Sequence, residues 1–185
     1  MLAIYKREFK SYFYSMTGSI FIAFLTFMTG IYFMAYNLHS GYPYFSYSLE
    51  GVMFVFLVAI PVLTMRSFSE ERRSRTDQLL LTSPVSVGKM VIGKYLAMVS
   101  VFLIPCMLFC AYPLIISTQG KAYFKADYAS ILVFFLLGCV YIAIGSFISA
   151  MTESQIIAAI GTFGVLMVVY LWDGLLGFLP SSAFG

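Results

Sequence analysis

The sequence predicts an all-α fold, that of a polytopic α-helical membrane protein with five spans. Hydrophobic residues make up 61% of the 185 residues and charged residues only 10%, whereas an ordinary soluble domain has ~25% charged residues. The apolar residues form continuous runs, most of them near the roughly 20 residues that a helix needs to cross a bilayer. A helix satisfies its own backbone hydrogen bonds in lipid, and continuous rather than alternating runs favour helices over barrel strands.

The chain begins with a predicted surface helix. Residues 1–16 combine Lys6, Arg7 and Lys10 with aromatic residues, which is typical of an amphipathic helix on the membrane surface and also of an ordinary flanking segment. A cleaved signal peptide is disfavoured, because the next apolar run is too long and no small-residue cleavage site follows it. The predicted spans are residues 18–37, 45–65, 90–119, 128–152 and 154–172, of which the second is the least clean.

The distribution of lysine and arginine predicts the orientation of the chain. Nine of the eleven basic residues lie in the N-terminal segment or between the second and third spans, and only Lys121 and Lys125 lie on the other side. Under the positive-inside rule, the N-terminus is cytoplasmic and the C-terminus is outside. Each Lys or Arg costs ~2.5–3.5 kcal/mol at the centre of a bilayer, so the arginines at 66–75 stay out of the lipid.

The most strongly charged stretch, SFSEERRSRTDQLLLTSPVS at residues 67–86, has the pattern of a short helix. Ser67 and Glu70 fit a capping box, Glu71 and Arg75 are four residues apart, and Pro84 ends the pattern. Leucines at 79–81 give this helix an apolar end. A simple topology anchor would need only positive charge, so the mixed charges and the apolar end indicate a docking helix.

Two motifs in and near this stretch suggest enzymatic functions that the rest of the sequence does not support. GKMVIGKY at residues 88–95 resembles a phosphate-binding loop, but Tyr95 stands where a Ser or Thr hydroxyl would hold magnesium. The E-E-x-x-x-R pattern at residues 70–75 occurs in intramembrane metalloproteases, which need histidines on later helices. The sole histidine, His39, lies upstream. We therefore expect no catalytic residues and no metal or cofactor site in this chain.

Two stretches resemble the membrane subunits of type-2 ABC transporters, the ABC-2 superfamily. IPVLTMRSFSEERRSRTDQLLLTSPVSVGKMVIGKY, residues 60–95, is similar to a proline-containing second helix followed by E-E-R-x-x-G-T-x-x-x-L-L-x-x-P-x-S. ISAMTESQIIAAIGTFG, residues 148–164, resembles the family's junction between the fourth and fifth helices. The resemblance is nearest to bacterial gliding-motility-associated and copper-enzyme-maturation permeases, and Arg75 departs from it where many members have Gly.

The resemblance implies a single transmembrane permease domain over residues 1–185, in a bacterial cytoplasmic (inner) membrane. Residues 69–83 would be a coupling helix that docks into a separate ABC ATPase subunit, which would hold the ATP and magnesium. A second permease subunit, identical or different, and membrane lipid are the other expected partners, and nucleic acid is not expected. The family usually has six spans, so C-terminal truncation is expected. The docking residues implied are Glu70, Glu71, Arg72, Arg73, Asp77, Leu79, Leu80 and Pro84.

Several features allow two interpretations. Glu50 is either a functional intramembrane group or an interfacial carboxylate, while Lys121, Lys125 and Asp127 are assigned to a solvated outer loop. Small residues permit close helix contacts, within the chain or between subunits. The small residues are Gly138, Gly145, Ser149, Ala158, Gly161 and Gly164.

A non-transporting scaffold would share this topology, whereas an ion-coupled transporter is disfavoured because no charge lies at mid-span. The aromatic interior suits an amphiphilic substrate or ordinary packing.

Overall fold

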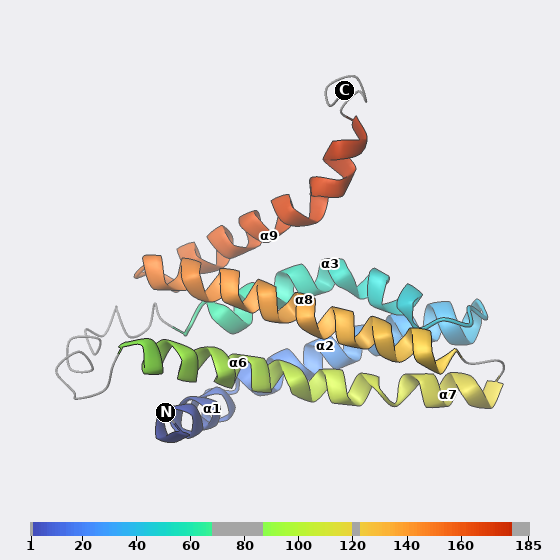
Figure 1. Ribbon diagram of the computed structural model, residues 1–185, viewed down its shortest axis with the longest axis horizontal. Helices are drawn as coiled ribbons and strands as arrows, with labels where there is room; N and C mark the ends of the chain where they lie inside the picture. The colour runs from blue at the N-terminus through green and yellow to red at the C-terminus, as the bar shows by residue number, and fades with distance from the viewer. Residues whose placement is uncertain (1, 68–86, 120–122, 179–185) are drawn as a thin grey trace.

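The computed structural model describes residues 2–67, 87–119 and 123–178, and every regular element within these ranges is a helix (Figure 1). Five segments are long and apolar enough to cross a membrane: Thr17–His39, Ser46–Thr64, Gly88–Thr118, Phe124–Met151 and Gln155–Trp172. The predicted all-α polytopic membrane fold is therefore confirmed. The helices are α1 (Leu2–Tyr14), α2 (Thr17–Phe33), the π-helical η1 (Met34–His39), α3 (Ser46–Thr64), α6 (Val87–Phe109), α7 (Tyr112–Gln119), α8 (Phe124–Met151) and α9 (Gln155–Phe178).

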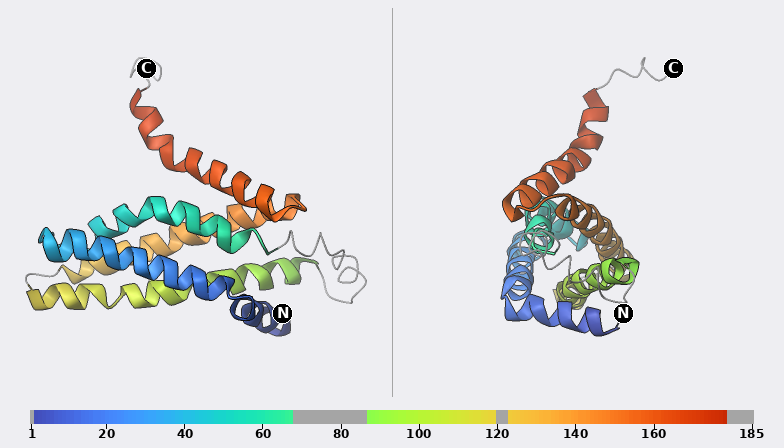
Figure 2. Two further views of the ribbon diagram at one scale, coloured as in Figure 1. Left: turned by 180° about the vertical axis from the view of Figure 1, so that it is seen from behind. Right: turned by 90° about the vertical axis from the view of Figure 1, so that its left-hand side faces the viewer.

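Helices α2, α3, α6 and α8 run alternately up and down in one bundle (Figure 1). Helix α1 lies across one end of the bundle, against α6 and α2. We call this the α1 end, and we call the opposite end, with η1, α7 and the start of α8, the loop end. Helix α9 begins at the α1 end against α3 and α8 and then diverges from the bundle (Figure 2). Among residues 155–172 of α9, the fully buried side chains are Ala158, Thr162 and Leu166.

The third candidate span consists of two helices, because proline interrupts it. Pro113 has no backbone N–H and cannot donate a hydrogen bond to the carbonyl of Phe109, four residues earlier. Helix α6 ends at Phe109, and the N–H of Cys110 donates instead to the carbonyl of Met107 at 3.3 Å. The predicted span 90–119 is therefore broken at residues 110–111, although both helices keep the same overall direction (Figure 1).

The centre of the bundle is a cluster of aromatic rings that packs against a glycine. The ring centroid of Phe56 on α3 lies 5.1 Å from that of Phe102 on α6 and 4.7 Å from that of Phe134 on α8. Gly138 on α8 faces the same rings, and a Cβ there would overlap both Phe102 and Phe56. This glycine thus lets α3, α6 and α8 approach closely. In lipid the hydrophobic effect does not drive helices together, so close packing at small residues contributes to their association.

At the loop end, two buried polar side chains hold the connection between η1 and α3. Asn37 Nδ2 donates to the carbonyls of Tyr42 and Tyr44 at 2.8 and 3.0 Å, and Asn37 Oδ1 accepts from Ser48 Oγ at 2.6 Å. Asp127 Oδ1 accepts the N–H of Phe45, immediately before α3, at 2.9 Å. Each bond satisfies a backbone or side-chain group that lipid could not.

Asp127 corrects one sequence-based assignment. The sequence placed it in a solvated outer loop, but it lies in the first turn of α8 and is fully buried. The physical reason is its hydrogen bond to a backbone N–H that α3 cannot satisfy itself. Lys125 is exposed, whereas Lys121 falls outside the described ranges.

The contacts of Gly138 predict that even one added methyl group will destabilise the bundle. In Gly138→Ala, we expect the free energy of unfolding to fall by about 1–3 kcal/mol, because the Cβ must displace two packed rings. Gly164→Ala is the matched control, since a Cβ at that helical glycine meets nothing within 4 Å. Its stability should stay unchanged or rise by up to about 1 kcal/mol. Denaturation in mixed micelles measures both, and equal stability of the two variants would contradict the packing.

Asn37→Leu should destabilise the loop end, because it removes three hydrogen bonds at a buried site. At ~0.5–1.5 kcal/mol for each bond, the expected loss is about 2–4 kcal/mol in the same mixed-micelle assay. His39→Leu, at an exposed position in η1, is the control and should change stability by less than about 0.5 kcal/mol. A loss of similar size in both variants would show that η1 tolerates no substitution and that the asparagine has no special role.

Candidate functional site

The candidate site lies at the α1 end, around residues 64–67, where α3 ends and the charged segment follows. The predicted coupling helix, residues 69–83, lies outside the residues that the structure describes. The described residues instead show what holds the chain immediately before this segment. The eight predicted docking residues also lie outside: Glu70, Glu71, Arg72, Arg73, Asp77, Leu79, Leu80 and Pro84.

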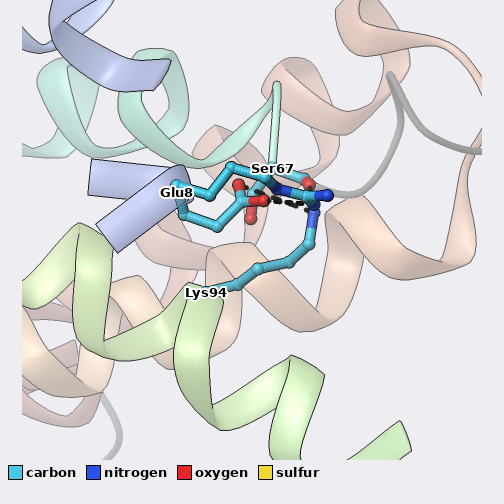
Figure 3. Close-up of polar contacts among 4 residues, drawn as sticks. Glu8, Ser67 and Lys94 are labelled. Atoms are coloured by element: carbon cyan, nitrogen blue, oxygen red, sulfur yellow. Dashed lines mark hydrogen bonds and ion pairs between the residues drawn. The ribbon is translucent and has the colours of Figure 1, made fainter. Parts of the chain in front are cut away.

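A buried lysine joins three elements at this position. Lys94 of α6 is only 2% exposed, and its Nζ donates a hydrogen bond to the backbone carbonyl of Ser67 at 2.7 Å. The same Nζ lies 3.9 Å from Glu8 Oε2 of α1. Figure 3 shows Glu8, Ser67 and Lys94 converging from α1, the end of α3 and α6. Burying an ammonium group is costly unless it is paired and hydrogen-bonded, so this lysine favours a close approach of the three elements.

Glu8 is oriented by its own neighbour and by the amphipathic pattern of α1. Its side chain is 14% exposed, and Oε1 accepts a hydrogen bond from Arg7 Nη2 at 2.8 Å. This bond to a largely exposed arginine leaves Oε2 directed toward Lys94. The helical period places the half-buried or buried residues of α1 on one face and its basic residues on another. The inward face carries Ile4, Tyr5, Glu8, Phe9 and Tyr12, and the exposed residues include Lys6, Arg7 and Lys10.

Helix α1 is further fixed to α6 by one polar and one steric contact. Tyr5 OH donates to Ser100 Oγ at 2.9 Å. Gly93, adjacent to Lys94, leaves room for Ile4, because a Cβ there would lie 3.2 Å from Ile4 Cγ2. A displacement of α6 would therefore move α1 with it.

The end of α3 is also tied to α8 and α2. Thr64 packs against Gly145 of α8, where a Cβ would lie 2.5 Å from Thr64 Oγ1. Ser149 Oγ donates to the carbonyl of Met65 at 3.2 Å. Arg66 Nη1 lies 3.4 Å from Thr17 Oγ1 at the start of α2, as a long hydrogen bond. Together with Lys94, these contacts attach residues 64–67 to three neighbouring helices.

The described side chains at this site connect neighbouring helices to one another. The site offers an ammonium group, a carboxylate and backbone carbonyls that bind one another. In the part of the chain that the structure describes, no three His, Cys, Asp or Glu side chains cluster closely enough to hold a metal ion. The arrangement can transmit displacement between the segment after Ser67 and the helices around it.

From the sequence, Lys94 is only one of the nine positive charges that predict the orientation, and Glu8 has no predicted role. Two signals were available. Lys94 is the eighth residue of a 23-residue helix whose later residues carry no charge, and a charge in such a position calls for a partner. Glu8 is the single acidic residue among the basic residues of 1–16. Their pairing could not be read from the sequence, because nothing local relates positions 86 residues apart.

Comparison with known proteins agrees with this architecture. The sequence model of the family described as "ABC-2 family transporter protein" matches residues 35–184, which is well over half of the chain. No curated protein and no solved structure matched the chain in the corresponding searches. The family match includes α3, the end of α3 at residues 64–67 and the whole of α6 with Lys94. The chain belongs to the ABC-2 transporter family, whose members are multi-pass permease subunits of ABC transporters.

Proposed function

We propose that this chain is the membrane-spanning permease subunit of an ATP-driven ABC exporter and that separate ABC ATPase subunits supply its energy. Membership of the ABC-2 family supports a permease that works with such an ATPase. The attachment of residues 64–67 to α2, α6 and α8 is the observation that supports coupling, because it connects the charged segment to the bundle. Under this proposal, residues 69–83 dock into the ATPase.

In the proposed mechanism, movement of the ATPase subunits reaches the helix bundle through the contacts of Lys94. When two ATPase subunits close on ATP, the docking residues at 70–84 move, and Ser67 moves with them. The Ser67 carbonyl is bonded to Lys94, so the displacement passes to α6 and, through Glu8, to α1. Two permease subunits would then switch between inward-facing and outward-facing states, which requires two alternative packings of these helices.

The proposal includes an orientation and a location. The nine basic residues gathered on one side support a cytoplasmic α1 end. The exposed basic residues of α1, opposite its inward face, support a place at the inner surface of a bacterial cytoplasmic membrane, where anionic lipid would attract them. Within the family, we place the chain near the gliding-motility-associated and copper-enzyme-maturation permeases, on the resemblance of residues 60–95.

Docking predicts that charge or polarity changes in residues 69–83 will break the complex. Glu71→Lys or Leu80→Asp should abolish co-purification with the partner ATPase, while membrane insertion stays intact. The control is Glu153→Lys, which changes an exposed acidic residue between α8 and α9 at the same end. It should leave co-purification unchanged. Retention of the ATPase by both docking variants would refute the coupling-helix assignment of residues 69–83.

Coupling through Lys94 predicts a defect in energy transfer without loss of assembly. In Lys94→Met, the ATPase should still co-purify, but stimulation of ATP hydrolysis by the permease should fall about fivefold or more, in the range of coupling energies between sites. Lys89→Met, at an exposed position on the same helix, should have no effect. Hydrolysis rates of the reconstituted complexes, compared with the ATPase alone, give the measurement. Normal stimulation in Lys94→Met would exclude this lysine from the coupling path.

A further inference from the structure

A groove of about 320 Å³ lies between α3 and α8, toward the loop end. Its volume is within the range of small-molecule sites, about 300–1,000 Å³. Its walls are almost entirely apolar. The residues that define it are Leu49, Glu50 and Met53 on α3 and Val133, Phe134 and Leu137 on α8.

Glu50 is the only charged residue that lines this groove. It is the fifth residue of α3, so it lies about 6 Å from the start of the helix at 1.5 Å per residue. Its side chain is exposed, and none of the residues that the structure describes forms an ion pair with it. A carboxylate beside apolar walls is a charge partner that a cation can use, and it repels an anion.

In lipid, the charge of Glu50 rather than the apolar groove walls determines which ligand the groove prefers. An alkyl chain is equally well solvated by lipid tails and by apolar side chains, so its transfer into the groove gains little. The headgroup differs, since an ammonium beside Glu50 gains a charge partner and an anionic headgroup is repelled. Ser46 and Ser130 also line the groove, and the Ser130 hydroxyl donates to the carbonyl of Ala126 at 2.9 Å.

We propose that this groove binds an amphiphile with a single positively charged amine headgroup, with its ammonium against Glu50 and its alkyl chain along Met53 and Leu137. Binding depends only on the groove. That such an amphiphile is the class of substrate exported rests on the proposed function. The proposal explains why an acidic residue lies inside a candidate span without an ion-pair partner among the described residues.

The test measures saturable binding of radiolabelled dodecyltrimethylammonium to the full chain in phosphatidylcholine nanodiscs, with empty nanodiscs as background. We expect Glu50→Gln to weaken binding about fivefold or more, while Glu153→Gln, at the other end of the molecule, binds like the wild type. Val133→Trp, which fills the groove from α8, should block binding while thermal unfolding shows an intact fold. Unlabelled dodecylamine should compete, and dodecyl sulfate should not.

The outcomes separate the groove from the transport function. Equal affinities of the wild type and Glu50→Gln, or equal competition by dodecyl sulfate, would overturn the proposed site. The same cation is then added to the reconstituted complex with its ATPase. Glu50-dependent binding with Glu50-dependent stimulation of ATP hydrolysis would support the substrate class. Binding without stimulation would keep the groove and reject the amphiphile as substrate, whereas failure of the ATPase to assemble would reject the proposed function alone.

Discussion

The structure depends on internal partners for most of the polar groups that its helices remove from water, although Thr26 Oγ1 and Asp127 Oδ2 have no hydrogen-bond partner among the described residues. At the α1 end, the ammonium of Lys94 is buried against the Ser67 carbonyl and near Glu8. At the loop end, Asn37 and Asp127 satisfy backbone groups before α3. Leaving such a group unpaired costs several kcal/mol in an apolar medium, which is more than most single packing contacts contribute. Buried polar pairs therefore fix both ends of α3, and packing fills the space between them.

Helix α3 therefore connects the α1 end to the loop end of the bundle. Its start is held by α8 through Asp127, and residues just past its end are held by α6 and α8. Between these points, Phe56 lies in the aromatic cluster against Gly138, so α3 cannot slide past α8 without displacing rings. A packed core with few voids resists small continuous deformation, and a push at one end is transmitted rather than absorbed. This rigidity suits an element placed between the proposed ATPase-docking segment and the proposed ligand groove.

The number and order of the spans could be predicted from the sequence because each span is marked by about 20 apolar residues. One unusual residue hardly changes the average hydrophobicity of such a run. The sequence did not predict the break at residues 110–111, although Pro113 marks it by removing one backbone donor. Asp127 was misassigned and the pairing of Lys94 was missed for a different reason. Their partners lie 82 and 27 residues away in the chain, and only the fold brings them together. The docking residues of 69–83 rest on helical spacing and family resemblance and stay a prediction.

Helix α9 behaves differently from the rest of the bundle because so little of it is buried. Among residues 155–172, the fully buried side chains are Ala158, Thr162 and Leu166, and most of the large apolar side chains are exposed. Its contacts with α3 and α8 hold the helix where it begins, but few buried side chains fix its angle where it diverges from the bundle. A loosely held apolar helix adjusts its tilt to the hydrocarbon thickness around it. Membranes of different thickness should thus reorient this one helix while leaving the other four spans in place.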